Sequence, residues 1–331
     1  MKNFMLCLSL TPLLSIVFWN VENCFDYKNS GYSASDAEFS SRGARHWTRK
    51  RFEAKTAAIG KTLLWAGLPD IVGMAEVENA FVLKSLCRTD VLRKYDYGYV
   101  HFDSPDPRGI DVGLLYRRDK IRILKAYPLP VEMNGKRLNT RDILYTCAID
   151  LTCGDTLHLF VNHHPSKYGG KQSGDRRIAA MRTLVRSVDS LLTRPEACIV
   201  AMGDFNDGPD GPAFGMIDSS LINLGRELIE ASPTKGNVGT IRYNGNWELI
   251  DNFLVSSGFY GKMKGSGKTQ DKTSDKKEME ILRPPFLLTR DKRFPGEKPY
   301  RTYVGPRYNG GVSDHLPIRI SCQAVISLCS L

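Results

Sequence analysis

The sequence lacks the cysteine patterns of zinc sites and of disulfide frameworks. Its eight cysteines are irregularly spaced, with no Cys-x-x-Cys pair and no Cys/His set at zinc-ligand spacing. No apolar run is long enough to predict a transmembrane span, and no internal repeat is found. These absences argue against a structural zinc protein, a membrane-inserted protein and a repeat protein.

A nucleotide-binding P-loop is missing as well. Gly265–Thr269 resembles the end of such a loop, but Lys262 stands where the earlier glycine is required, and no apolar helix follows. Residues 261–278 are rich in lysine, glycine and serine, which is typical of a solvated surface loop. We therefore expect a flexible insertion here and reject an NTPase function.

Length and charge favour a single basic enzyme domain. The 331 residues are 42% hydrophobic, enough for a large core, and 46 basic against 36 acidic residues give a net charge of +10. This excess favours a polyanionic partner such as nucleic acid. Residues 1–15 resemble a short signal peptide, so we favour a secreted or periplasmic protein over a cytoplasmic one, with one domain over 16–325 and a monomeric state.

Polar side chains follow an apolar, strand-like run near the middle of the chain. Ala197–Ala201 leads into Met202-Gly203-Asp204-Phe205-Asn206-Asp207, and turn residues come next. A carboxylate and a carboxamide at the mouth of a buried strand are costly to bury without a metal ion, a water or a phosphate as partner. Taken alone, the stretch is more typical of a turn that closes a strand.

Five further segments share this design and change that interpretation. Three are apolar runs that end in polar groups, one carries its acid inside the run, and the last enters a strand: Ile16–Asn23, Asp70–Glu78, Leu157–Ser166, Leu249–Val255 and Gly311–Ile318. Together the segments supply Asn, Asp, Glu and His with few thiols. Such an oxygen-rich set suits Mg²⁺ or Mn²⁺ better than zinc.

The segments resemble the motifs of the endonuclease/exonuclease/phosphatase superfamily, closest to bacterial secreted-nuclease-like members. The motifs occur in family order: Phe18-Trp19-Asn20-Val21-Glu22-Asn23, Ala75-Glu76-Val77-Glu78-Asn79, Asn162-His163-His164-Pro165-Ser166, Gly203-Asp204-Phe205-Asn206-Asp207 and Ser313-Asp314-His315-Leu316-Pro317. The resemblance implies an α/β fold, a four-layered α/β/β/α sandwich of two mixed β-sheets flanked by helices. His164 departs from the pattern, and we expect it to pack where an aromatic residue is usual.

The resemblance also implies roles for individual residues. The expected ligands of Mg²⁺ or Mn²⁺ are Asn20, Glu22, Glu76 and Asp314, whereas Glu78 is expected to be a surface charge. The expected catalytic residues are His163, Asp204, Asn206, Asp251 and His315. The His315–Asp251 pair either takes the proton from water or clamps the phosphate, and Asp204 is the other candidate base. Asn206 orients Asp204 or donates to a phosphate oxygen, and His163 donates to a non-bridging oxygen.

Two arginines are predicted to bind substrate phosphate from loops at the rim of the cleft. Arg108 precedes Gly109, and Arg141 follows Thr140 just before a strand. An ion pair with a neighbouring acid is an equally good interpretation of each. Periodic apolar residues predict helices over Arg49–Ala66 and 174–192, the second with its arginines on a solvated face, and Asn79 is predicted to cap a short helix.

These expectations favour a divalent-metal-dependent phosphodiesterase, most simply a nuclease acting on DNA or RNA. A phosphatase or phosphodiesterase acting on a phospholipid, an inositol phosphate or another small phosphoester is the alternative, because it would use the same central residues. A non-catalytic binding protein on this fold is disfavoured, because each expected central position holds a chemically competent residue.

Overall fold

Two six-stranded sheets form the centre of the molecule. The computed structural model describes residues 13–31, 33–167, 170–232, 238–264 and 278–323. One sheet has the order β15 (Met279–Ile281), β20 (Ile318–Gln323), β1 (Leu13–Cys24), β2 (Ile71–Val77), β4 (Asp111–Arg117), β3 (Tyr97–His101). The other has the order β11 (Ile222–Asn223), β14 (Asp251–Val255), β10 (Cys198–Asp204), β9 (Thr156–His163), β8 (Ile143–Asp150), β5 (Ile121–Leu129).

Both sheets are mixed. β1 runs parallel to β2 and β9 runs parallel to β10, whereas the other strand pairs are antiparallel. Four two-stranded ribbons lie in the connections: β6–β7 (Glu132–Met133, Lys136–Arg137), β12–β13 (Ile241–Tyr243, Asn246–Glu248), β16–β17 (Leu288–Arg290, Glu297–Pro299) and β18–β19 (Tyr303–Val304, Arg307–Tyr308).

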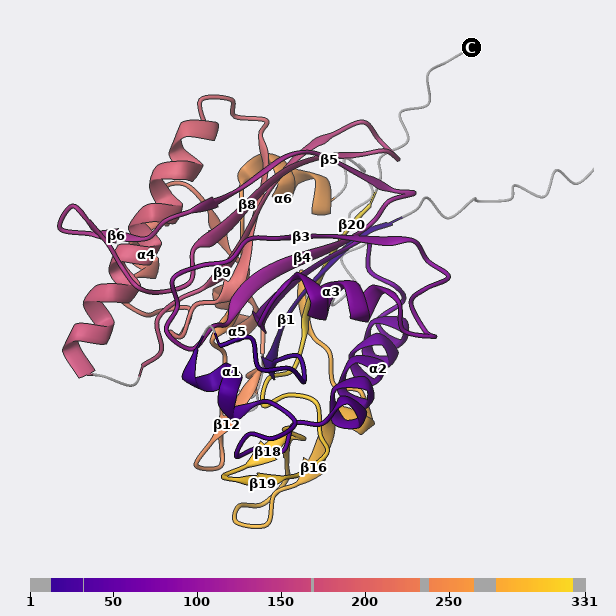
Figure 1. Cartoon of the computed structure of the whole chain (residues 1–331). Coiled ribbons are helices and arrows are strands. Elements are labelled where there is room, and N and C mark those ends of the chain that lie inside the picture. Colours follow the sequence, from indigo (N-terminus) through magenta and orange to yellow (C-terminus); the bar gives the residue numbers. More distant parts are fainter. Residues whose placement is uncertain (1–12, 32, 168–169, 233–237, 265–277, 324–331) are drawn as a thin grey trace, which may run out of the picture.

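Some helices cover the outer faces of the sheets, and the last two along the chain border the layer between them. The α-helices are α1 (Ala34–Glu38), α2 (Arg49–Trp65), α3 (Ala80–Cys87), α4 (Gly170–Leu191), α5 (Leu224–Glu230) and α6 (Ser257–Lys264), with short 3₁₀ turns η1 (Phe214–Met216) and η3 (Pro285–Leu287). Figure 1 shows α2 and α3 on one side of the sheets and α4 on the other. The predicted α/β/β/α sandwich is therefore confirmed.

Three apolar layers explain this architecture. Along β1, Ile16 and Phe18 face the layer between the sheets, whereas Val17 and Trp19 face α2, because successive side chains of a strand point to opposite faces. Phe160 and Ile199 of the second sheet face α4 in the third layer. Each strand that is apolar on both faces is thus buried on both faces.

The sequence located the main helices and mislocated some boundaries. α2 begins at the predicted Arg49, and Asn79 caps α3 by accepting from the Val82 N–H. Lys262 and Lys264 lie in α6, which corrects the loop predicted to begin at residue 261, and Gly265–Thr269 lie outside the described residues. β1 begins at Leu13, so three residues of the predicted leader belong to the sheet. None of the described helices is long and apolar enough to cross a membrane.

Candidate active site

Neighbouring strand ends of the second sheet bring three predicted catalytic residues together. His163 ends β9 and Asp204 ends β10, and these parallel strands place the two residues directly opposite each other. Asp251 begins the antiparallel β14 and pairs with Asp204 on the other side. Asp251 is therefore at the start of its strand, where the sequence had predicted it inside the run. All three side chains lie at one edge of the sheet.

Two backbone irregularities turn acids of the first sheet towards that edge. The pairing of β1 with β2 shifts register between Asn20 and Cys24, and the pairing of β2 with β4 shifts between Ala75 and Val77. Glu22 and Glu76 adopt φ values of 49° and 62°, a left-handed conformation that is uncommon for glutamate. Bulges of this kind interrupt the alternation of a strand and re-aim a side chain.

Asp204 lies at the centre of a buried network. Its Oδ2 accepts a hydrogen bond from Asn20 Nδ2 at 3.0 Å, and its Oδ1 accepts from the backbone N–H of Asn206 at 2.9 Å. Two imidazoles face the same carboxylate, with His163 Nε2 at 3.7 Å and His315 Nε2 at 3.8 Å from Oδ2. The structure thus brings the predicted catalytic residues and Asn20 around one point.

His315 and Asp251 form the closest pair of this network. His315 Nδ1 lies 2.8 Å from Asp251 Oδ2, an oxygen that also accepts from the Thr240 hydroxyl. The bond at Nδ1 directs Nε2 of the same ring towards Asp204. An acid held against one imidazole nitrogen fixes the orientation of the ring and stabilises its charged form.

Burial and charge set opposite protonation states for these groups. Burial, with the charge of Asp251, raises the pKa of Asp204 to about 7. Burial alone would lower the pKa of His315, but Asp251, Asp204 and Asp314 raise it well above its ordinary value. Burial together with Arg141 and Arg108 lowers the pKa of His163 well below its ordinary value. These shifts favour the charged form of His315 and the neutral form of His163.

A second acidic group forms around Arg301. The guanidinium bridges two carboxylates, with 3.0 Å from Nε to Glu22 Oε1 and 2.9 Å from Nη2 to Asp314 Oδ2. Glu22 Oε2 accepts from the Thr302 N–H at 2.8 Å. Burial and Asp314 raise the pKa of Glu22 to about 7, against the lowering effect of Lys55 and Arg301. Glu22 and Asp314 therefore lie together, balanced by an arginine.

The chemical type of the donor atoms at this edge suits a hard divalent cation, although Glu22, Glu76 and Asp314 do not form one compact ligand group among the described residues. Glu76 Oε2 accepts from the Asn23 N–H at 2.7 Å, and Oε1 faces Arg108 Nη1 at 3.7 Å and His163 Nε2 at 3.9 Å. Carboxylate and amide oxygens are the ligands that Mg²⁺ and Mn²⁺ prefer. Asp204, Asp251 and His315 form a further group close enough to share an ion. A divalent metal ion is thus compatible with the residues present.

Arg141 forms the ion pair that was one of its two interpretations, whereas Glu78 differs from its prediction. Arg141 is buried and is 2.7 Å from Asp106 Oδ2, and it donates to the carbonyls of His163 at 3.2 Å and His164 at 2.6 Å. Arg141 thus links Asp106 to the end of the strand that carries His163, as the ion-pair interpretation predicts. Glu78, predicted as a surface charge, is buried and accepts from the Asp26 N–H at 2.6 Å.

His164 packs as predicted and Arg108 stays accessible. The imidazole of His164 meets Phe205 edge-on at 4.9 Å between ring centroids, and burial with Arg141 lowers its pKa to about 3. The side chain of Arg108 is 44% exposed and borders a hollow of about 480 Å³ beside the His163 strand end. Arg176 of α4 borders the same hollow, although the sequence had placed it on a solvated helix face.

Sequence reasoning missed Lys55. This buried lysine of α2 donates to the backbone carbonyl of Glu22 and, at 2.8 Å, to the Thr302 hydroxyl. Burial lowers its pKa. The signal was available, because Lys55 falls on the apolar stripe of Phe52 and Ile59, where a charged residue needs a buried partner.

One known protein family has a model that matches most of this chain. The model of the Endonuclease/Exonuclease/phosphatase family matches residues 15–324. A search of curated proteins finds no match.

Three solved structures illustrate the shared fold. They are the human Nocturnin catalytic domain with bound sulfate (15% identity, TM-score 0.57, 94% of each chain), TDP2 of D. rerio with a single-strand DNA product (16%, 0.55, 94% of this chain and 99% of that one) and a mannosyl-6-phosphatase of Bacteroides thetaiotaomicron VPI-5482 (15%, 0.55, 93% and 98%). At these identities the likeness shows the fold alone.

The raised pKa of Asp204 predicts how the stability of the folded protein depends on pH. Folded protein holds this proton up to about pH 7, whereas unfolded protein releases it near the ordinary value of 3.8, so folded stability falls as pH rises between these values. Asp204→Asn removes the effect. The melting temperature of the variant relative to the parent should therefore rise from about pH 5 to about pH 7 and then level off, measured by circular dichroism in chelator.

The exposed Asp90→Asn, which also removes one acid, is the matched control. A difference in melting temperature between Asp204→Asn and the parent that stays constant with pH would contradict the assigned burial of charge.

Proposed function

Since this chain belongs to the endonuclease/exonuclease/phosphatase family, we propose that it is a nuclease that hydrolyses phosphodiester bonds of DNA or RNA with Mg²⁺ or Mn²⁺. The family assigns a hydrolase acting on phosphoester bonds with a divalent metal ion, and the choice of nucleic acid is our inference. The observation that carries this choice is the arginine-bordered hollow beside His163.

The hollow suits a chain with more than one phosphate. Arg108 lies at the boundary between the hollow and the catalytic network, since its Nη1 is 3.7 Å from Glu76 Oε1. Arg176 donates to the Asn139 carbonyl at 3.2 Å, which places its guanidinium at the hollow. A phosphodiester bound at the network would thus leave its neighbouring phosphate near these arginines. The DNA product bound in the TDP2 structure is in keeping with such an occupant.

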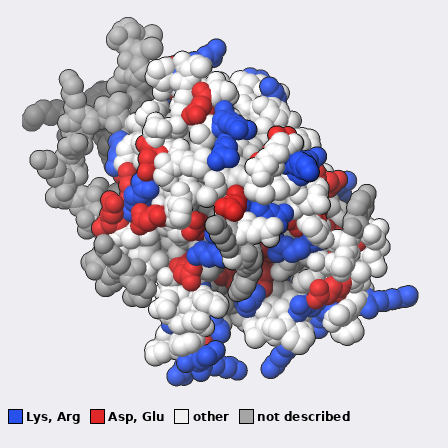
Figure 2. Space-filling model, turned by 90° about the vertical axis from the view of Figure 1, so that its left-hand side faces the viewer, with Lys and Arg blue, Asp and Glu red and all other residues white. Residues whose placement is uncertain are grey.

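The overall charge gives weaker support. On the face drawn in Figure 2, Lys and Arg side chains are interspersed with Asp and Glu. The net charge of +10 therefore does not form a broad basic surface over the described residues of that face. The argument for nucleic acid rests on the local arginines.

The geometry suggests a division of labour within the network. A bound divalent ion would neutralise phosphate charge and favour ionisation of water, and Asn20, Glu22, Glu76 and Asp314 are the residues proposed to hold it. Asp204, with a pKa of about 7, is suited to accept a proton from water. His315 is already charged, so it is suited to stabilise negative oxygen, with Asp251 holding its orientation.

Two neighbours complete this proposal. Asn206 orients Asp204 through its backbone N–H, and its side-chain amide donates to the His164 carbonyl at 3.0 Å. His163 is neutral at pH 7 and can donate an N–H to a non-bridging oxygen. Its position depends on Arg141, which holds the His163 carbonyl.

A small phosphoester is the second candidate. The hollow is also bordered by Asn139, Gln172 and Ser173, groups able to hydrogen-bond a sugar or an inositol, and one solved structure of the same fold is a mannosyl-6-phosphatase. An activity panel in Mg²⁺ with plasmid, single-stranded DNA, RNA, sphingomyelin, inositol phosphates and sugar phosphates separates the candidates. Turnover of small esters without cleavage of nucleic acid would replace our proposal.

We expect the metal requirement to depend on Glu76. Glu76→Gln keeps the side-chain volume and removes a charged oxygen donor, so the Mg²⁺ concentration for half-maximal activity should rise at least about tenfold. Excess chelator should abolish activity in the parent. The exposed Glu53→Gln on α2 is the control, with an unchanged titration. Identical titrations for the parent and Glu76→Gln would remove Glu76 from the ligand set.

The His315–Asp251 pair should behave as one unit. His315→Ala should lower kcat by roughly a hundredfold or more, and Asp251→Asn should act through the same ring. The double variant should then lose far less than the product of the single losses, measured at saturating substrate with folding checked by circular dichroism. Losses that multiply would show that Asp251 acts independently of His315.

The phosphate contacts should appear in the salt dependence of binding. Affinity for single-stranded DNA, measured in an Asp204→Asn background, should fall as salt rises, and each lost phosphate contact should flatten the log–log slope by about 0.7. Combined Arg108→Ala and Arg176→Ala should therefore reduce the slope by about 1.4. Arg186→Ala, exposed and almost three turns further along α4, should leave it unchanged. A parent slope near zero would argue against nucleic acid.

A further inference from the structure

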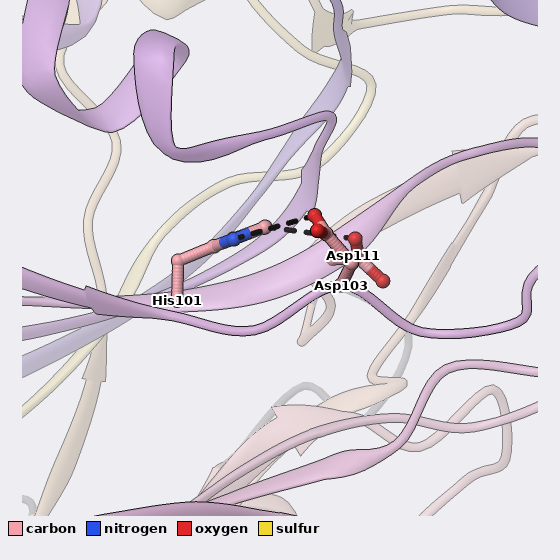
Figure 3. Close-up of side chains that lie close together, drawn as sticks. All are labelled: His101, Asp103 and Asp111. Atoms are coloured by element: carbon pink, nitrogen blue, oxygen red, sulfur yellow. Dashed lines mark ion pairs between the residues drawn. The ribbon is translucent and has the colours of Figure 1, made fainter. Parts of the chain in front are cut away.

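A second group of potential metal ligands lies at the neighbouring edge of the first sheet. His101 ends β3 and Asp111 begins β4, with Asp103 in the loop between them. Figure 3 shows the His101 imidazole pointing towards the two carboxylates. The side chains of His101 and Asp111 are 4% and 6% exposed, whereas that of Asp103 is 87% exposed. The group therefore has a buried half and a solvent-facing half.

The buried half is incompletely satisfied. His101 Nε2 lies 3.5 Å from Asp111 Oδ2, and no hydrogen-bond partner for this nitrogen is found among the described residues. A buried polar atom without a partner is unfavourable for stability. Asp111 Oδ1, in contrast, accepts from the Ser104 N–H at 3.1 Å and from the Ser104 hydroxyl. His101 Nε2 thus faces Oδ2 of Asp111, the carboxylate oxygen that Ser104 does not contact.

The spacing of these atoms matches two ligands of one small cation. Zinc binds imidazole nitrogen and carboxylate oxygen at about 2.0–2.2 Å, so two ligands of a tetrahedral ion lie about 3.4 Å apart. The separation between Nε2 and Oδ2 is 3.5 Å. Asp103 offers a third donor, because its Oδ1 lies 3.8 Å from Nδ1 of the same imidazole and one donor atom from each of the three residues lies within 4.8 Å of the others.

The chemistry of the donors separates this group from the catalytic one. A neutral imidazole with two carboxylates suits Zn²⁺ and related transition metals, whereas Mg²⁺ prefers oxygen alone. A fourth position would be taken by water, because Asp103 lies at the surface.

We propose that His101, Asp103 and Asp111 bind a transition-metal ion of the Zn²⁺ class. The bound ion would restrict the movement of the loop of residues 102–110. This loop carries Asp106, which pairs with Arg141, and Arg108, which faces Glu76. Asp111 pairs in register with Val77, the residue after Glu76. The ion would therefore hold the arginine side of the cleft without taking part in the reaction.

The test is direct binding of Zn²⁺ to the full chain with Mg²⁺ in excess. Calorimetry should show one more Zn²⁺ site in the parent than in Asp103→Asn, or an affinity lowered at least about tenfold by that exposed change. His101→Gln should have the same effect. Asp90→Asn, equally exposed and outside the group, should bind as the parent does.

Two further measurements locate the ion. Co²⁺ bound to the parent should give visible absorption that Asp103→Asn alters and Asp90→Asn keeps. Zn²⁺ should also slow amide hydrogen exchange across residues 102–110 in the parent and leave that of Asp103→Asn unchanged. Equal Zn²⁺ affinity and stoichiometry in the parent and Asp103→Asn would overturn the proposal, and His101 would then serve as an ordinary partner of Asp111.

Discussion

The structure depends on neutralising carboxylates that are buried where the two sheets meet. Asp204 and Asp251 are 2% and 1% exposed, and isolated charges at such positions would be prohibitively costly. The neutralising group, His315, comes from the segment that enters β20 of the opposite sheet. The ion pair therefore requires the sheets to be stacked in one relative position. Asn20 of β1 adds a second link across the same gap through its bond to Asp204.

A similar balance holds the other acidic group. Glu22 and Asp314 are kept together by Arg301, and Lys55 enters from α2 to bind the backbone beneath Glu22. Arg301 follows the β16–β17 ribbon and precedes β18, so it belongs to a connection outside both sheets. The sheets position the acids, and a helix and a loop provide the compensating charge. This arrangement leaves cationic side chains near the site. A substrate phosphate can bind them, and a metal ion can replace them beside the carboxylates.

The sequence identified residues through motifs but predicted their directions less well. Alternation along β2 places Ile71 and Ala75 between the sheets, which predicts that Glu76 faces the helices. The bulge after Ala75 reverses this, and a single local irregularity of this kind leaves no period to detect. The destination of Arg141 was equally hidden, because its partner Asp106 is 35 residues away. The apolar layers were predictable, since they follow from strand and helix periodicity.

Several residues at the site have an unusual backbone conformation. Left-handed conformations occur at Glu22, Asn23, Glu76 and Asn206. They cost the two glutamates about 1–2 kcal/mol each, whereas asparagine adopts this conformation more readily. Specific hydrogen bonds hold these residues. Thr302 and Arg301 donate to Glu22, Asn23 donates to Glu76, and Asn206 donates to Asp204. Four such residues at one edge lower the stability of the fold. Strain of this kind persists where surrounding structure enforces it, and it gathers at functional sites. The large apolar layers provide the stability that allows this edge to be shaped for chemistry.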